Sequence, residues 1–218
     1  GNEAPPQNIY QNQEPAPGLK MDQWQYETLK RLAMSFGTYY GIDEEGRLHP
    51  GGTVRPGEGL LADDVLGSHA VGEHRGLVFI DTLDQQPPRT DNLGTLTIET
   101  EYLEGLFVVN AHVLWYPKES TKTIPALSPP PEDKGVLGLR VPTQLSGINL
   151  RGVLHTAGNV TYCGKPRIYG GLLSDGIIGA CASQGSLMEV WYDFDLRDGL
   201  HRGVPVVCVV PGTWQTRL

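Results

Sequence analysis

Pairs of acidic residues in strand-like contexts are the positions at which this sequence could support hydrolytic chemistry. Glycoside hydrolysis needs two carboxylates that converge on one cleft, and enzymes that use it occur on β-helical folds. Two pairs qualify by context, Asp81 with Asp84 and Asp193 with Asp195. Nothing in their spacing indicates that either pair converges with the other. We therefore expect no enzymatic activity and assign no catalytic residue, with a carbohydrate-active β-helix enzyme as the alternative.

Residues that could bind a metal ion are dispersed along the chain. The six histidines are His49, His69, His74, His112, His155 and His201. His112 and His155 fall near each other in the aligned repeats described below, but not in one column, and we expect turn residues there rather than ligands. Asp63 and Asp64 are adjacent acids in a loop-like stretch, which are usually only solvated. Residues 193–199 resemble a calcium loop but lack its third acid and its distal Glu. The sequence thus predicts no metal site and no cofactor.

The three cysteines, an odd number, leave at least one thiol unpaired. Cys163 and Cys181 are 18 residues apart, close to the repeat period, so they could stack within bonding distance. We expect instead that Cys163 and Cys181 are two buried free thiols. Cys208 is the third cysteine. No Cys-x-x-Cys pair is present, so a structural zinc site has little support. Asn159-Val160-Thr161 matches an N-glycosylation acceptor, which matters only in a protein secreted by a eukaryote.

A short apolar pattern bounded by glycines recurs and predicts the elements that position these residues. Gly152–Gly158 (GVLHTAG) is followed by Gly171–Gly176 (GLLSDG), with 18 or 19 residues between equivalent glycines. An earlier copy, Gly105–Val113, matches Gly152–Val160 column by column. Repetition near this period indicates a solenoid in which like columns stack about 4.8 Å apart. We therefore expect a mainly β fold, a single-stranded β-helix of short Gly-bounded rungs, with a β-sandwich as the alternative.

The alignment of the two clearest copies also predicts which side chains stack. It places Val153 over Leu172 and His155 over Ser174. The columns Val153/Leu172 and Leu154/Leu173 are both apolar, so the alignment leaves open which of them faces the interior. Because both are apolar, we expect the outer face of the sheet to be covered as well, with the N-terminal helix as the candidate cover.

Composition and charge limit the class of protein. The chain has 218 residues, with 28 Gly and 17 Pro, which favours many short strands and turns over long helices. Its formal net charge is −8 and its pI is about 5.2. An acidic surface repels phosphate backbones, so nucleic-acid binding over a wide face is not expected. No apolar run of about 18 residues is present, so no segment reads as a membrane span.

Along the chain, three parts are expected. Residues 1–20 are rich in Pro, Gln and Asn and should form a flexible lead-in. Residues 21–75 should hold one amphipathic helix, over 22–39 with Asp22 and Gln25 as a capping box, followed by an irregular loop. Residues 76–218 should form the β-solenoid, interrupted by a Pro-rich excursion at 117–134 and closed by a final strand within 203–211.

The repeat region supports a family resemblance. The run GVLHTAGNVTYCGKPRIYGGLLSDG at 152–176, with the strand ending at 190–193, resembles the C-terminal region of PilX-type pilus assembly proteins. Three earlier pieces are also similar to that family, namely 32–40, 76–82 and 105–110. The similarity runs with gaps from about residue 29 to 196, and it rests on the order and spacing of motifs that are mostly Gly and aliphatic residues.

The resemblance implies a minor-pilin-like subunit of a bacterial type IV pilus system. Such subunits carry an N-terminal prepilin signal and a long hydrophobic helix, so we expect this sequence to be the soluble part that follows that helix. The family offers no catalytic residues. We accordingly expect a non-enzymatic structural domain at the cell surface or the periplasmic side of the inner membrane, in contact with other pilin subunits or pilus assembly proteins. A bactofilin-like self-assembling scaffold is a further alternative.

Overall fold

Parallel strands form the two main sheets of the molecule. The computed structural model describes residues 21–55, 57–67, 76–128, 141–182, 185–191, 200–201 and 204–205. Within these ranges the larger sheet has seven strands, in the order β13 (Glu189–Trp191), β11 (Arg167–Ser174), β9 (Leu150–Thr156), β5 (Leu103–Val109), β3 (Leu77–Ile80), β1 (Tyr39–Ile42) and β2 (Leu48–Pro50). The smaller sheet has four, in the order β12 (Ile178–Ala180), β10 (Val160–Tyr162), β6 (Ala111–Trp115) and β4 (Gly94–Ile98).

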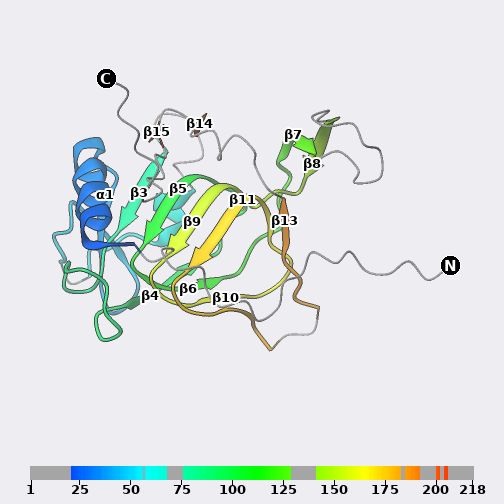
Figure 1. Cartoon of the computed structure of the whole chain (residues 1–218). Helices are drawn as coiled ribbons and strands as arrows, with labels where there is room; N and C mark the ends of the chain where they lie inside the picture. Colours follow the sequence, from blue (N-terminus) through cyan, green and yellow to red (C-terminus); the bar gives the residue numbers. More distant parts are fainter. Residues whose placement is uncertain are drawn as a thin grey trace, which may run out of the picture.

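All neighbours in these two sheets are parallel except β1 and β2, which are antiparallel. The expectation of a mainly β fold is therefore confirmed, with parallel rather than antiparallel main sheets. Consecutive strands alternate between the sheets: β3, β5, β9, β11 and β13 lie in the larger sheet, and β4, β6, β10 and β12 in the smaller (Figure 1). The repeat aligned across 105–113 and 152–160 is confirmed by pairing, since Gly105 pairs with Gly152 and Val113 with Val160.

The predicted register of the second pair of repeats is wrong by one residue. Gly152 pairs with Gly170 rather than Gly171, so Val153 lies beside Gly171 and His155 beside Leu173. Gly105, Gly152 and Gly170 form one column in which each residue has a positive φ, at 146°, 128° and 144°. Glycine adopts these angles without steric cost. In the sequence pattern, either Gly170 or Gly171 could align with Gly152. The backbone geometry shows that Gly170 is the equivalent residue.

The interior between the two sheets is filled by apolar side chains from both. Phe107, Leu154 and Leu172 are neighbours across β5, β9 and β11, and they belong to or pack against this core. Leu154 and Leu172 thus form the column that faces inward. This pair differs from both predicted columns, Val153/Leu172 and Leu154/Leu173. Side chains of the smaller sheet complete the core, among them Val113, Trp115 and Val160.

The helix α1 (Gln23–Phe36) covers the outer face of the larger sheet. Its capping box is confirmed: the Gln25 backbone N–H donates to the Asp22 carboxylate at 2.7 Å, and the Gln25 side chain accepts from the Asp22 N–H at 3.0 Å. Gly37, with φ 74°, ends the helix, so Tyr39 begins β1 instead of extending the helix as predicted. The helix stands beside β3 and buries Tyr26 and Ala33 against the sheet (Figure 1).

The apolar outer face of the larger sheet explains why both predicted columns are apolar. Residues of β3 and β5 form a second cluster with α1, and Val153 of β9 packs against it. The helix therefore covers this face of the sheet, as expected from the two apolar columns. The members of this cluster are Tyr26, Ala33, Tyr39, Leu77, Phe79, Leu106 and Val108.

The stretch expected to be an irregular loop, 41–75, contains short regular elements where it is described. It holds the second half of β1, the strand β2 and the helix α2 (Ala62–Leu66), and α2 packs against β4. Strand β4 alternates buried and exposed side chains, as a half-buried strand does. The described helices include none long and apolar enough to cross a membrane.

Two small hairpins stand apart from the main sheets. Strand β7 (Thr123–Ser128), within the Pro-rich excursion 117–134, pairs antiparallel with β8 (Val141–Ser146), which follows the excursion. Ile124 and Leu145 of this pair pack in a third cluster with Tyr102, Ile148 and Tyr169. Strand β14 (Leu200–His201) pairs with β15 (Val204–Pro205). The final strand expected within 203–211 is described only at β15, which pairs with β14 and not with β12 or β13. The lead-in 1–20 lies outside the described residues.

Candidate functional site

Asp81 is the most completely enclosed acid among the described residues and lies directly after β3. Its side chain is 0% exposed. One carboxylate oxygen accepts from the Tyr26 hydroxyl at 2.5 Å and from the Thr82 N–H at 2.9 Å. The other accepts from the Tyr39 hydroxyl at 2.7 Å and forms an ion pair with the Lys30 ammonium at 2.6 Å. Four donors therefore surround one carboxylate of the acid pair considered for hydrolytic chemistry.

The two tyrosines of this cluster are held as hydrogen-bond donors. Burial raises the pKa of Tyr26 and Tyr39 far above the ordinary value for a phenol, and the hydrogen bond to the Asp81 carboxylate raises each pKa further. The Lys30 ammonium lies 5.4 Å from the centre of each tyrosine ring, within the range of a cation–π contact. The cluster joins α1, β1 and β3 and acts as a structural anchor.

Asp84, the predicted partner of Asp81, belongs to a separate network in its own loop. It accepts hydrogen bonds from Arg89 at 2.7 Å, from the Asn92 amide at 2.8 Å and from the Thr82 hydroxyl at 3.1 Å. Desolvation works against its ionisation, but these hydrogen bonds prevail and lower the pKa of Asp84. The two acids thus share Thr82, through its N–H and its hydroxyl respectively, and their other partners differ. The other candidate pair, Asp193 and Asp195, and the calcium-like run 193–199 lie outside the described residues.

The described histidines pair with separate groups and do not converge. His155 faces Asp175 at 3.3 Å between its Nε2 and a carboxylate oxygen, whereas the Nδ1 of His112 accepts from the Asn159 N–H at 3.1 Å. His49 pairs with Asp43 at 2.8 Å. His69 and His74, and the side chain of His201, are not described. Within the described part of the chain, no three His, Cys, Asp or Glu residues gather as metal ligands.

Two other positions singled out in the sequence have local structural partners. Asp63 accepts from the Glu99 N–H at 2.8 Å and lies 3.6 Å from the Lys118 ammonium, which ties α2 to the end of β4. Asp64 is exposed. Asn159 is exposed, but its side-chain oxygen accepts from the Ile177 N–H at 2.9 Å and so links the turn before β10 to the turn before β12.

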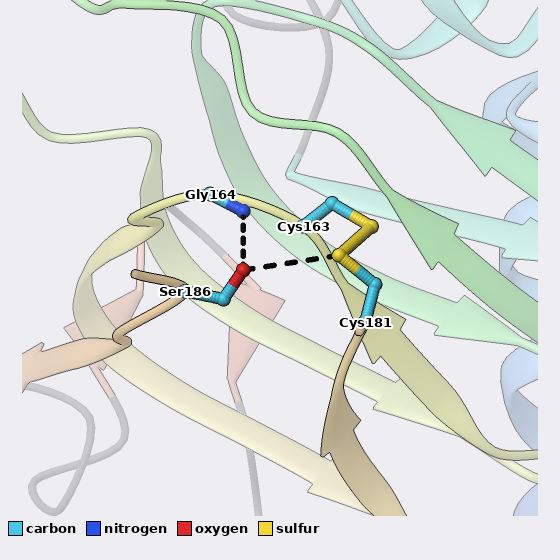
Figure 2. Close-up of a disulfide and its surroundings, with 4 residues drawn as sticks. All are labelled: Cys163, Gly164, Cys181 and Ser186. Carbon is cyan, nitrogen blue, oxygen red and sulfur yellow. Dashed lines mark hydrogen bonds between the residues drawn. A yellow bond between two sulfur atoms is a disulfide. The ribbon is translucent and has the colours of Figure 1, made fainter. Parts of the chain in front are cut away.

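Cys163 and Cys181 form a disulfide, so the expectation of two free thiols is wrong. The cysteines follow β10 and β12, which pair in parallel, and their Cα atoms lie 5.2 Å apart. Both are partly exposed rather than buried. Ser186 lies beside the bond: its hydroxyl accepts from the Gly164 N–H at 3.0 Å and sits 3.8 Å from the Cys181 sulfur (Figure 2). The 18-residue spacing matches the true strand register, which is why the two sulfur atoms meet.

The last strands of the two main sheets form the most exposed apolar region of the described structure. We define the terminal segment as residues 175–182 and 185–191, which contain β12 and β13. In the described structure, β13 lies at the edge of the larger sheet opposite β2, and β12 lies at the edge of the smaller sheet opposite β4. Its large apolar side chains are widely exposed: Ile177 73%, Leu187 61%, Val190 54%, Ile178 43% and Trp191 37%. Apolar edge strands are uncommon in monomeric proteins, because they invite pairing with another chain.

Sequence inspection had not singled out this surface or the partners of Asp81. The signal for the first was the pair Ile177-Ile178 after the last glycine of the repeat. The signal for the second was Lys30, four residues after Tyr26 on the otherwise apolar face of α1. Comparisons with family models, with characterised proteins and with solved structures give no match to the chain.

Proposed function

We propose that the two parallel sheets are the faces of a β-solenoid. The alternation of β3 to β6 and of β9 to β13 between the sheets supports this, as does the column of glycines that keeps its register through three strands. In such a fold each turn adds one strand to each sheet and buries its apolar side chains against the preceding turn. The resulting body is rigid and repetitive, which suits a structural role.

We further propose that this domain is the non-enzymatic, surface-exposed part of a type IV pilus-like minor subunit. The observation that carries the proposal is the Cys163–Cys181 disulfide, which ties equivalent positions of successive repeats. Disulfides persist in oxidising compartments such as the bacterial periplasm and the cell surface. A pilus subunit is assembled and exposed in those compartments, and the order of motifs along the chain is similar to that of PilX-type proteins.

The partners of Asp81 favour this function over the carbohydrate-active alternative. A glycosidase requires two carboxylates that reach the sugar from a cleft. Asp81 is fully buried and receives four donors, while Asp84 is held by Arg89 and Asn92. In the described structure, the carboxylates of both acids are thus engaged by other protein groups. The exposed terminal segment is instead suited to contact with a neighbouring pilin or pilus assembly protein.

The experiment that tests the proposal is mass spectrometry of surface fibres sheared from the native cell. We expect peptides of this chain in the fibres, joined to a methylated first residue and a long apolar helix. A periplasmic marker protein, measured in the same preparation, controls for lysis. Absence of the chain from fibres, together with an ordinary secretory cleavage site at its native N-terminus, would refute the assignment and direct attention to polysaccharide turnover.

The exposed apolar edge favours one second candidate, a bactofilin-like self-assembling scaffold. Strands β12 and β13 end the two sheets at the same end of the stack, so copies of the chain could associate there. Light scattering and electron microscopy of the purified chain distinguish the candidates. Filaments of the chain alone would support the scaffold, whereas a stable monomer would exclude it and leave the pilus subunit.

A further inference from the structure

The terminal segment has little apolar burial to hold it against the rest of the molecule. Its five large side chains from Ile177 to Trp191 are between 37% and 73% exposed, and Met188 is the partly buried residue that packs against the core. In the preceding repeat the equivalent positions are buried: Ile168, which pairs with Val190, is 0% exposed, and Val160, which pairs with Ile178, is 1% exposed. The free energy that attaches each successive repeat therefore falls sharply at this segment.

Polar contacts to the preceding turns are the other described attachments, and they include the Arg167–Glu189 ion pair at 2.8 Å and the contact of Asp175 with His155 at 3.3 Å. Strand β12 pairs with β10 over three residues, and β13 pairs with β11 over three residues. Further backbone bonds run from the Leu187 N–H to the Gly164 carbonyl, in the connection between these strands, and from the Glu189 N–H to the Pro166 carbonyl, at the start of β13, both at 3.0 Å. Short ladders at an exposed edge open readily, because water replaces each hydrogen bond as it breaks.

The disulfide lies within the terminal segment, directly after β12. Cys181 is the first residue after β12, and its N–H also donates to the Tyr162 carbonyl at 2.8 Å. Ser186 bridges the same region by accepting from Gly164 (Figure 2). The covalent bond thus fixes the connection between β12 and β13 onto the connection between β10 and β11. Because both cysteines are partly exposed, a thiol in solution can reach the bond.

We propose that the Cys163–Cys181 disulfide is a redox-operated clamp on the terminal segment. While the bond is formed, β12 and β13 stay paired with β10 and β11. When it is reduced, the terminal segment detaches while the strands from β1 to β11 keep their fold. Detachment uncovers the apolar inner residues of β10 and β11, among them Val160 and Ile168, together with their unpaired strand edges.

The chemical step is thiol–disulfide exchange with a dithiol reductant. A reductant thiolate attacks one cysteine sulfur, the sulfur–sulfur bond breaks, and the other cysteine leaves as a thiolate that takes up a proton. The second thiol of the reductant then attacks the mixed disulfide and releases the first cysteine. Two electrons and two protons pass to the protein, which gains two thiols, and the reductant becomes a cyclic disulfide.

Hydrogen–deuterium exchange of the whole chain, oxidised and after reduction by dithiothreitol with alkylation, tests the clamp. A Cys208→Ser background prevents exchange with the third cysteine. We expect peptides covering 176–191 to exchange at least about ten-fold faster after reduction, whereas peptides covering 94–115 change by less than about two-fold. Unchanged protection of 176–191 would overturn the proposal, and so would loss of protection throughout the chain.

Two variants separate the covalent bond from its surroundings. Cys163→Ser with Cys181→Ser removes the bond permanently, and its exchange pattern should match that of the reduced protein. Ser186→Ala keeps the bond and removes the hydroxyl beside it, so 176–191 should stay protected. If Ser186→Ala exposes the segment as strongly as reduction does, the hydroxyl contacts and not the disulfide hold the segment, and the clamp is refuted. Should the double serine variant fail to fold, the reduced protein alone decides the matter.

Discussion

Gly170 lies directly beside Gly152 in the larger sheet, and both residues have positive φ angles, 144° and 128°. A Cβ atom on Gly170 would overlap the carbonyl oxygen of Gly152. Gly105 continues the column on the next strand with φ 146°. Each of these glycines has a φ angle that other residues rarely adopt, so the repeat depends on a shared backbone conformation as well as on shared side chains.

Replacing Gly170 by alanine should destabilise the protein strongly. The positive φ and the overlap with Gly152 both oppose a Cβ, and we expect a loss of about 3 kcal/mol or more in the free energy of unfolding. Gly171→Ala is the matched control, because its Cβ would lie 3.9 Å from the nearest side-chain atom, on Val153. Urea denaturation measures both. Equal losses in the two variants would contradict the observed register.

Leu172 and Leu173 are neighbours in β11 that face opposite sides of the sheet. Leu172 packs against the core between the sheets, whereas Leu173 is 39% exposed. Leu172 is partly buried, and Leu172→Asp places an unpaired charge against the core, which should cost about 3 kcal/mol or more. Leu173→Asp should cost less than about 1 kcal/mol, since its carboxylate can reach water. Thermal unfolding of the two variants checks the difference, and a reversed order would place Leu173 inside.

Lys30 supplies the positive charge that faces the buried Asp81. Lys30→Met leaves Asp81 without its ionic partner, and we expect a loss of about 3 kcal/mol. Arg31→Met, one residue along the same helix, is the control, because Arg31 is exposed and should lose less than about 0.5 kcal/mol. Adding Asp81→Asn to Lys30→Met should recover part of the loss, since it removes the orphaned charge. A cost in Lys30→Met equal to that in Arg31→Met would show that the pair contributes nothing to stability.

The free energy of unfolding should fall at alkaline pH because of Tyr26 and Tyr39. Folding raises the pKa of both phenols above the value of 10.0 found in an unfolded chain. Their contribution is therefore fully present below about pH 10 and is lost as the pH rises further, because the unfolded chain then binds fewer protons. Each tyrosine should lower the free energy of unfolding by up to about 1.4 kcal/mol per pH unit.

Urea denaturation from pH 8 to pH 11 measures this decline. The Tyr26→Phe/Tyr39→Phe variant should be less stable at pH 8, because Asp81 loses two donors, yet its stability should fall less steeply above pH 10. Tyr116→Phe, at a side chain that is 43% exposed, should keep the slope of the unchanged protein. A slope unaltered in the double variant would mean that other groups cause the alkaline loss.

The sequence by itself determined the features that depend on neighbours along the chain. The capping box of Asp22 and Gln25 involves residues within a single helical turn. The alternation in β4 and the match of 105–113 with 152–160 follow from strand periodicity. These signals need only local geometry, so the helix, the strands and the mainly β class could be predicted.

Only the tertiary structure decided the contacts between distant strands. Two adjacent glycines satisfied the repeat equally well, and the choice of Gly170 depended on a carbonyl that the partner strand contributes. That register then brought Cys163 to Cys181, where the sequence had favoured free thiols. The partners of Asp81, Lys30 and Tyr26, lie more than 50 residues from it along the sequence. A pairing of this kind depends on how whole elements pack, and no local pattern in the chain records it.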